Sequence, residues 1–215
     1  MTYALPLHEQ VLLLALDDEE GTLPQPNADL AVAAAIIVEL HEAGRIALGR
    51  TEVEVVDGRP TGDEALDAVL TAMTDGKPAT LTTWIQRLAE GADLREATAR
   101  RLVDAGILER RGGAFFGLGP DRYPEAYGAA EDAVIARLTR AVSTEGDVDR
   151  PTRLLLSIAD AAQLLVLVID RKELKRRAGR IEDLTGGEAV GEAVRAALDE
   201  FMALISITVI NATVT

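Results

Sequence analysis

The sequence contains no cysteine, which excludes disulfide bonds, thiolate-bound zinc and cysteine nucleophiles. This absence is compatible with a reducing compartment. Aromatic residues make up only 3% of the 215 residues, and Trp84 is the single tryptophan. The start of the sequence also lacks the basic residues and the long apolar stretch of a secretion signal. We therefore expect a cytoplasmic protein.

Long uninterrupted apolar segments are missing as well. The longest apolar-rich run, residues 154–169, contains Asp160 and Gln163. It is also shorter than the roughly 20 residues that a membrane-spanning helix needs. The run therefore predicts a buried core helix.

Positive charge is scarce, because 36 acidic residues outnumber 22 basic ones and the net charge is −14. Such a chain is repelled by nucleic acid and by anionic lipid unless its cations gather on one face. Any partner that carries phosphates must therefore be met locally.

Hydrophobic residues make up 48% of the chain, which is enough for one sizeable core. Apolar residues at helical spacing dominate the pattern, and residues 45–48 and 53–56 are short strand candidates. Thr61 and Glu64 predict a capping box at the start of one helix. We predict a mainly α fold: a single globular helical domain over residues 1–215, with a short β-hairpin and minor strands. The expected helices cover 7–16, 27–42, 81–89, 94–105, 124–143, 152–169, 171–180 and 188–205. A further helix is expected after the capping box, with Leu66, Val69, Leu70 and Met73 at helical spacing.

Residues 107–118 predict the β-hairpin, with Gly112 and Gly113 as its turn. Phe115 and Phe116 point to opposite faces of a strand, so one ring faces outward unless another element covers it. Either both rings pack under neighbouring helices, or the tip inserts into a membrane interface or a partner. The preceding helix and this hairpin also mimic a winged helix, but the arginines of residues 87–111 are nearly balanced by acids, which does not favour DNA binding.

Motifs for catalysis are absent from the sequence, including nucleophile elbows, phosphate-binding loops and HExxH. His8 and His41 lack the convergent ligands that a metal site needs. The acidic run at 17–20 has no alternating ligand spacing and is typical of a solvated loop. We expect no enzyme activity, no catalytic residues, no cofactor and no metal.

A basic segment, residues 171–180, contains six cations and one anion. On one continuous helix, Lys172, Arg176 and Arg180 would share a face. The segment is either a solvated face that offsets neighbouring acids, or a patch for the phosphates of a lipid head group or of nucleic acid.

Several segments, taken in order, resemble the Golgi phosphoprotein 3 family. They are residues 9–16 (EQVLLLAL), 38–40 with 44–46, 61–63, Trp84 with Ile85, 102–108 (LVDAGIL) and 150–165. The resemblance extends from about residue 7 to residue 205. It implies a helical fold with a hydrophobic hairpin, binding to phosphatidylinositol 4-phosphate at the Golgi surface and a grip on the cytoplasmic tails of glycosyltransferases.

Of the family's head-group contacts, the resemblance carries over Arg95 alone. The family's Trp position falls near Pro24, its first Arg falls at Ala33, and its Arg-x-x-Arg reads ADLR at residues 92–95. Arginine greatly outnumbers lysine, which together with the resemblance predicts a bacterial-type member.

We hypothesise from the sequence a non-enzymatic peripheral membrane or adaptor protein at the inner face of a membrane. Its expected partners are an anionic phospholipid head group, of which phosphatidylinositol 4-phosphate is the model, and an unknown protein. Alternatives are a winged-helix-like DNA-binding regulator and a module that self-associates into homo-oligomers. The hairpin residues predicted to insert or to dimerise are Phe115, Phe116 and Leu118. The residues predicted to bind head groups are Arg95, Arg110, Arg111, Arg171, Lys172, Lys175 and Arg176.

Overall fold

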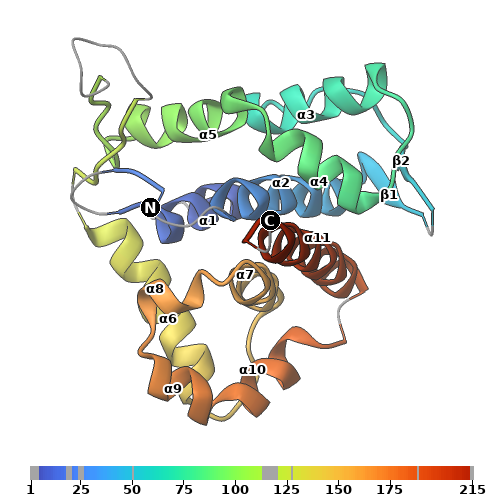
Figure 1. Ribbon diagram of the computed structural model, residues 1–215. Helices are drawn as coiled ribbons and strands as arrows, with labels where there is room; N and C mark the ends of the chain where they lie inside the picture. The colour runs from blue at the N-terminus through green and yellow to red at the C-terminus, as the bar shows by residue number, and fades with distance from the viewer. Residues whose placement is uncertain are drawn as a thin grey trace.

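The computed structural model describes residues 5–17, 21–23, 27–49, 51–112, 121–126, 128–187 and 189–213, with side chains outside 92–93 and 202–213. These residues form eleven helices and one two-stranded sheet (Figure 1). The helices are α1 (Leu7–Ala15), α2 (Ala28–Glu42), α3 (Glu64–Asp75), α4 (Leu81–Ala89), α5 (Ala92–Asp104), α6 (Ala129–Ser143), α7 (Arg150–Ala161), α8 (Leu165–Val168), α9 (Arg171–Arg176), α10 (Ala178–Thr185) and α11 (Ala189–Thr213). The strands are β1 (Ile46–Leu48) and β2 (Val53–Val55). The predicted mainly helical globular fold is confirmed.

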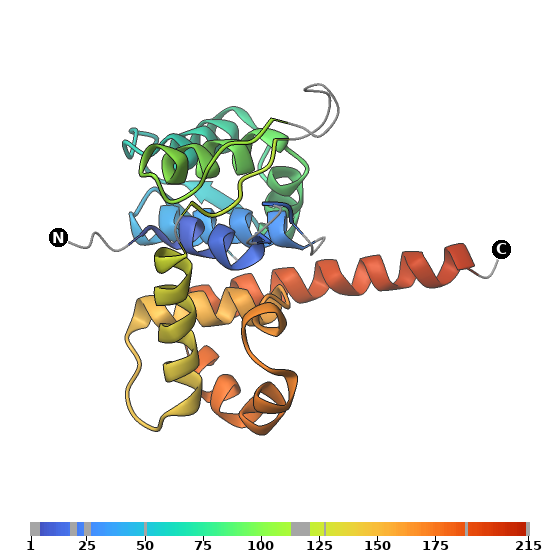
Figure 2. The same cartoon turned by 90° about the vertical axis from the view of Figure 1, so that its left-hand side faces the viewer.

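The helices are arranged in three layers, and α1 and α2 form the middle layer (Figures 1 and 2). Helices α3, α4 and α5 cover one side of this central pair. Helices α6, α7 and α8 cover the other, and α9 and α10 lie outside them. Helix α11 packs against α2, α4 and α7, and Figure 2 shows its C-terminal part continuing beyond them. The sequence of α2 is apolar nearly all round, which is typical of a helix that is enclosed on every side.

The N-terminus of α1 is capped by a residue from α2. The backbone amides of Leu7 and His8 donate to the two carboxylate oxygens of Glu39 over 2.8 and 3.2 Å. A carboxylate at this position satisfies free amide groups and complements the positive end of the helix dipole. This contact fixes the central pair of helices relative to each other.

The short strands agree with the sequence prediction, but the capping box does not. Strands β1 and β2 pair antiparallel, with Ile46 opposite Val55. Helix α3 begins after Asp63, whose carboxylate accepts from the amides of Ala65 and Leu66. The Thr61 hydroxyl donates instead to Asp67, 2.7 Å away. The predicted box is thus wrong, because Asp63 offers a closer acceptor to the first turn.

The apolar run at 154–169 is buried for most of its length, as predicted, but it is not one helix. Helix α7 ends at Ala161, and Gln163 adopts the left-handed backbone with φ 58°. The amide of Leu164 donates to the carbonyl of Ala159 over 2.7 Å, which closes the helix end. The chain then turns and starts the single-turn helix α8.

Two further predicted helices have different bounds. The segment 171–180 is divided at Arg177 into α9 and α10. Helix α6 starts at Ala129 rather than 124, because the preceding residues pair with the chain that follows α5. Helix α11 extends to Thr213, so the β-branched tail, which the sequence left undecided, continues the last helix.

The base of the hairpin is formed, with a different register from the predicted one. Antiparallel bridges join Leu108 to Glu125 and Arg111 to Arg122. A two-residue turn at 112–113 would place Ala114 opposite Arg111, so that turn is wrong, and the connection is longer. The tip, with Phe115, Phe116 and Leu118, lies outside the described residues.

Candidate functional site

Arg95 on α5 is bound to a carboxylate of the central layer. Its Nε donates to Oδ1 of Asp29 over 2.8 Å, and its Nη2 donates to Oδ2. Both donors of the guanidinium fork therefore hold Asp29, in the first turn of α2. The single head-group contact that the family resemblance carries over is thus already paired in the structure.

The two arginines at the base of the hairpin also face acids. Arg110 donates from Nε to Asp121 over 2.6 Å, and this hydrogen bond raises the pKa of Arg110. Arg111 pairs with Glu109 at 3.1 Å, and both side chains are more than half exposed. An exposed pair of this kind contributes little energy, so Arg111 can exchange its partner more readily than Arg95 can.

The other arginines of α5 are paired as well. Arg100 contacts Glu64 at 2.5 Å, and Arg101 contacts Glu9 at 2.8 Å and also Asp63. A DNA-reading helix needs a clear excess of cations. Among the described side chains of α5, no such excess is left, which does not favour the winged-helix alternative.

Within the basic segment, two arginines share one acid. Glu173 accepts from Arg177 over 3.1 Å and also from Arg176, and these hydrogen bonds lower the pKa of Glu173. Arg180 donates to the carbonyl of Gly146 over 2.5 Å. The predicted common face of Lys172, Arg176 and Arg180 does not form, because the helix is interrupted at Arg177.

Three cations of this segment are different. Arg171, Lys172 and Lys175 are exposed, and none makes an ion pair with a described residue. We call these three residues the α9 cations. The helix before them, α8, exposes 38% of Val166 and 39% of Leu167, which are unusual surface residues in this molecule. Exposed aliphatic side chains therefore lie a few positions before the α9 cations in the chain, with Asp170 as the N-cap of α9 between them.

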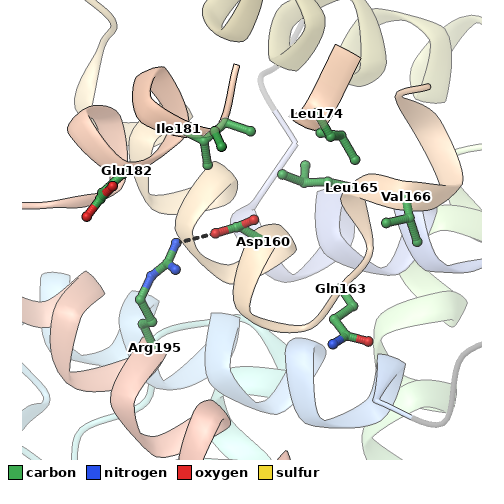
Figure 3. Close-up of a pocket in the computed structure, with 9 residues that line it drawn as sticks. Asp160, Gln163, Leu165, Val166, Leu174, Ile181, Glu182 and Arg195 are labelled. Carbon is green, nitrogen blue, oxygen red and sulfur yellow. Dashed lines mark hydrogen bonds and ion pairs between the residues drawn. The ribbon is translucent and has the colours of Figure 1, made fainter. Parts of the chain in front are cut away.

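A pocket of about 660 Å³ lies next to α8 and α9, between these helices and α7, α10 and α11 (Figure 3). Leu165, Val166 and Leu174 line one side of the pocket, and a fourth apolar residue, Ile181, lies beside Glu182. The polar side holds an ion pair between Asp160 on α7 and Arg195 on α11, 2.6 Å apart and each about one third exposed. A pocket of this size, with an apolar wall and few polar groups, suits a small amphipathic ligand.

Sequence reasoning missed this pocket. Its lining comes from five helices, and three of its polar residues are far apart in the sequence: Asp160, Glu182 and Arg195. One signal was present, since Asp160 and Gln163 interrupt the apolar run and both line the pocket. Polar residues in a buried run are retained where they meet a partner or a cavity.

A second polar group lies between α1, α2, α3 and α5. His8 is fully buried, with Nδ1 2.5 Å from Glu39 and Nε2 3.8 Å from Asp63. The neighbouring Glu9 is 2% exposed, and burial raises the pKa of its carboxyl group, while Arg101 opposes this effect. These side chains join four helices, so they hold the fold together rather than face a substrate. No three His, Asp or Glu side chains converge as metal ligands in the part of the chain that is described.

Residues 7–201 match the family model described as Golgi phosphoprotein 3 (GPP34). The chain belongs to this family. The match covers the central helices, both outer layers and the packed part of α11, so the three-layer arrangement is the body of this GPP34 protein.

Two fungal relatives of this GPP34 chain bear the name vacuolar protein sorting-associated protein 74. The protein from Eremothecium gossypii is 30% identical over 158 residues, which cover 62% of this chain and 48% of the relative. The protein from Schizosaccharomyces pombe is 26% identical over 164 residues, which cover 65% and 49%. The chain thus spans about half the length of these curated relatives. A bacterial origin stays a prediction, because both relatives are fungal.

None of the described helices is both long and apolar enough to pass through a bilayer.

Proposed function

We propose that this GPP34 chain is a non-enzymatic adaptor that binds peripherally to an anionic membrane surface through the α9 cations. The observation that carries the proposal is their lack of partners. Arg171, Lys172 and Lys175 are exposed and unpaired among the described residues, in a chain of net charge −14. They follow the exposed Val166 and Leu167, and basic groups next to aliphatic ones are typical of an interfacial surface.

The energy of such a contact is sufficient for reversible binding. Each basic residue near an anionic surface contributes about 1 kcal/mol, so the α9 cations contribute about 3 kcal/mol together. Repulsion from the distant acids is screened beyond about 8 Å at physiological salt. Local cations can therefore outweigh the negative charge of the whole molecule.

The remaining predicted cations have a secondary role in this proposal. Arg95, Arg110, Arg111 and Arg176 each hold a carboxylate, which a lipid phosphate would have to replace. The specific recognition of phosphatidylinositol 4-phosphate that the family resemblance implies rests on Arg95 here. We therefore propose recognition of negative charge in general, with the protein partner of the adaptor bound elsewhere.

Flotation with vesicles tests the proposal. We expect the full chain to float with phosphatidylcholine vesicles that contain phosphatidylserine or phosphatidylinositol 4-phosphate, and not with phosphatidylcholine alone. The substitutions Lys172→Glu and Lys175→Glu together remove at least about 2 kcal/mol of attraction, which corresponds to at least about thirtyfold weaker partitioning.

The matched control reverses one charge elsewhere: Lys77→Glu, at an exposed site between α3 and α4, is compared with Lys172→Glu alone. The Lys77→Glu variant should float nearly as well as the parent chain. Equal loss in both variants, or no flotation of the parent chain at low salt, would refute the role of the α9 cations.

A further inference from the structure

The pocket behind α8 and α9 lies next to one of the α9 cations. Leu174 lines its apolar side. Arg171 precedes Leu174 by three positions on the same helix, so the two side chains are neighbours on one face. Lys175 follows Arg171 by four positions, which places a second cation beside the first. A cationic group is therefore located at the edge of an apolar pocket.

The apolar side of the pocket opens toward the surface. Leu165 and Ile181 are buried at its base, whereas Val166 is 38% exposed. Figure 3 shows Leu165, Val166 and Leu174 gathered on one side of the pocket, away from Arg195. A flexible hydrocarbon chain can follow such a path from the surface to the buried leucine and isoleucine.

The polar side does not oppose this occupant. Asp160 is neutralised by Arg195, and the carboxylate of Glu182 points away from the apolar residues in Figure 3. The Nε atom of Arg195 is buried and has no acceptor among the described residues. A buried donor without an acceptor is unfavourable, so this side of the pocket is not optimised for packing within the chain alone.

We propose that this pocket receives one acyl chain of an anionic phospholipid from the membrane, while the phosphate of the same lipid lies on Arg171. The inference rests on the proposed function, since it assigns a binding site for a single lipid to the same surface, next to the α9 cations. It adds a stoichiometry of one lipid per chain and a requirement for hydrocarbon as well as charge.

Titration with dihexanoyl phosphatidylglycerol below its micelle concentration tests the site, with native mass spectrometry as the readout. We expect saturable binding of one lipid to the full chain, and at least tenfold weaker binding of dihexanoyl phosphatidylcholine. The substitution Ala178→Leu fills the pocket from an exposed position and should reduce binding at least tenfold, whereas Ala178→Ser keeps the space and should not. Arg171→Glu should weaken binding of the phosphatidylglycerol to the level of the phosphatidylcholine.

The results separate this site from the proposed function. Because Ala178→Leu keeps all the α9 cations, it should still float with acidic vesicles. Vesicle binding by the parent chain without saturable binding of the short lipid would overturn the pocket proposal and leave the proposed function standing. Unchanged lipid binding in Ala178→Leu, or several weakly bound lipids per chain, would overturn it too. Circular dichroism of each variant confirms that the helices are intact.

Discussion

The guanidinium of Arg95 directs two donors at the carboxylate of Asp29, while Lys172 and Lys175 have no such partner among the described residues. From the sequence, all three residues were predicted to bind the phosphate of a lipid head group. An arginine that is held by a bidentate carboxylate must lose that contact before it binds another anion. At the scale of single residues, the neighbours of a cation therefore decide whether it is available.

Glu9 provides a test at this scale. Burial raises the pKa of its carboxyl group above the ordinary value, so the folded chain holds this proton more tightly than the unfolded chain does. The stability from this group is thus present below about pH 4.5 and is lost as pH rises through the folded pKa. Glu9→Gln cannot titrate, and its side chain has nearly the same size and shape. We expect the variant to gain free energy of unfolding relative to the parent chain as pH increases above 4.5.

Urea unfolding from pH 4 to pH 8 measures this difference. Glu9→Ala serves as the control, because it leaves a cavity at a buried position and should be less stable than Glu9→Gln at every pH. Parallel stability curves for the parent chain and Glu9→Gln would show that Glu9 does not titrate differently in the folded state.

At the scale of elements, the junction between α7 and α8 depends on one unusual backbone conformation. Gln163 has a φ of 58°, a region that glycine adopts freely and that costs other residues about 1 kcal/mol or more. We expect Gln163→Gly to raise the free energy of unfolding by up to about 1 kcal/mol, partly offset by the greater freedom of glycine in the unfolded chain. Gln163→Ala keeps the unfavourable conformation and should give no gain. Thermal unfolding of the two variants compares them, and a gain in the alanine variant would show that the side chain, not the backbone, is responsible.

The same junction explains which elements could be predicted from sequence. Helix α4 was located correctly because burial of one face imposes an apolar period on it, and α2 because it is one long segment that is apolar nearly all round. The breaks at Gln163 and Arg177 carry neither glycine nor proline, so no local signal marked them. The pairing of Arg111 with Arg122 was missed because the glycine pair at 112–113 suggested a tighter turn.

The candidate site was predictable only in part, for a related reason. Charge composition identified the α9 cations, since a basic run is visible within the sequence itself. The partners of Arg95 and Arg195 lie 66 and 35 positions away, and the pocket requires five helices to meet. Such contacts depend on tertiary packing, which residue spacing within one helix does not specify.

At the scale of the whole molecule, the small residues of α2 set how closely the layers approach. Ala33, Ala34 and Ala35 are completely buried between the two outer layers. A larger side chain there has no free space, and added methylene groups in a packed core typically cost about 1–3 kcal/mol. We expect Ala34→Leu to lower the free energy of unfolding by about this amount. In contrast, Ala136→Leu at an exposed position of α6 should change it by less than about 0.5 kcal/mol, as measured by urea unfolding.

Helix α11 contacts both outer layers and the central pair, and it comes late in the chain. The hydroxyl of Thr82 on α4 donates to Glu200, a residue 118 positions further along. Proteins are synthesised from the N-terminus, and contacts between distant positions form slowly. During translation, therefore, the apolar faces of α4 and α7 that α11 covers stay exposed until α11 has been synthesised and packs against them. This delay makes the nascent chain dependent on protection from aggregation for longer than its short, mostly local helices would suggest.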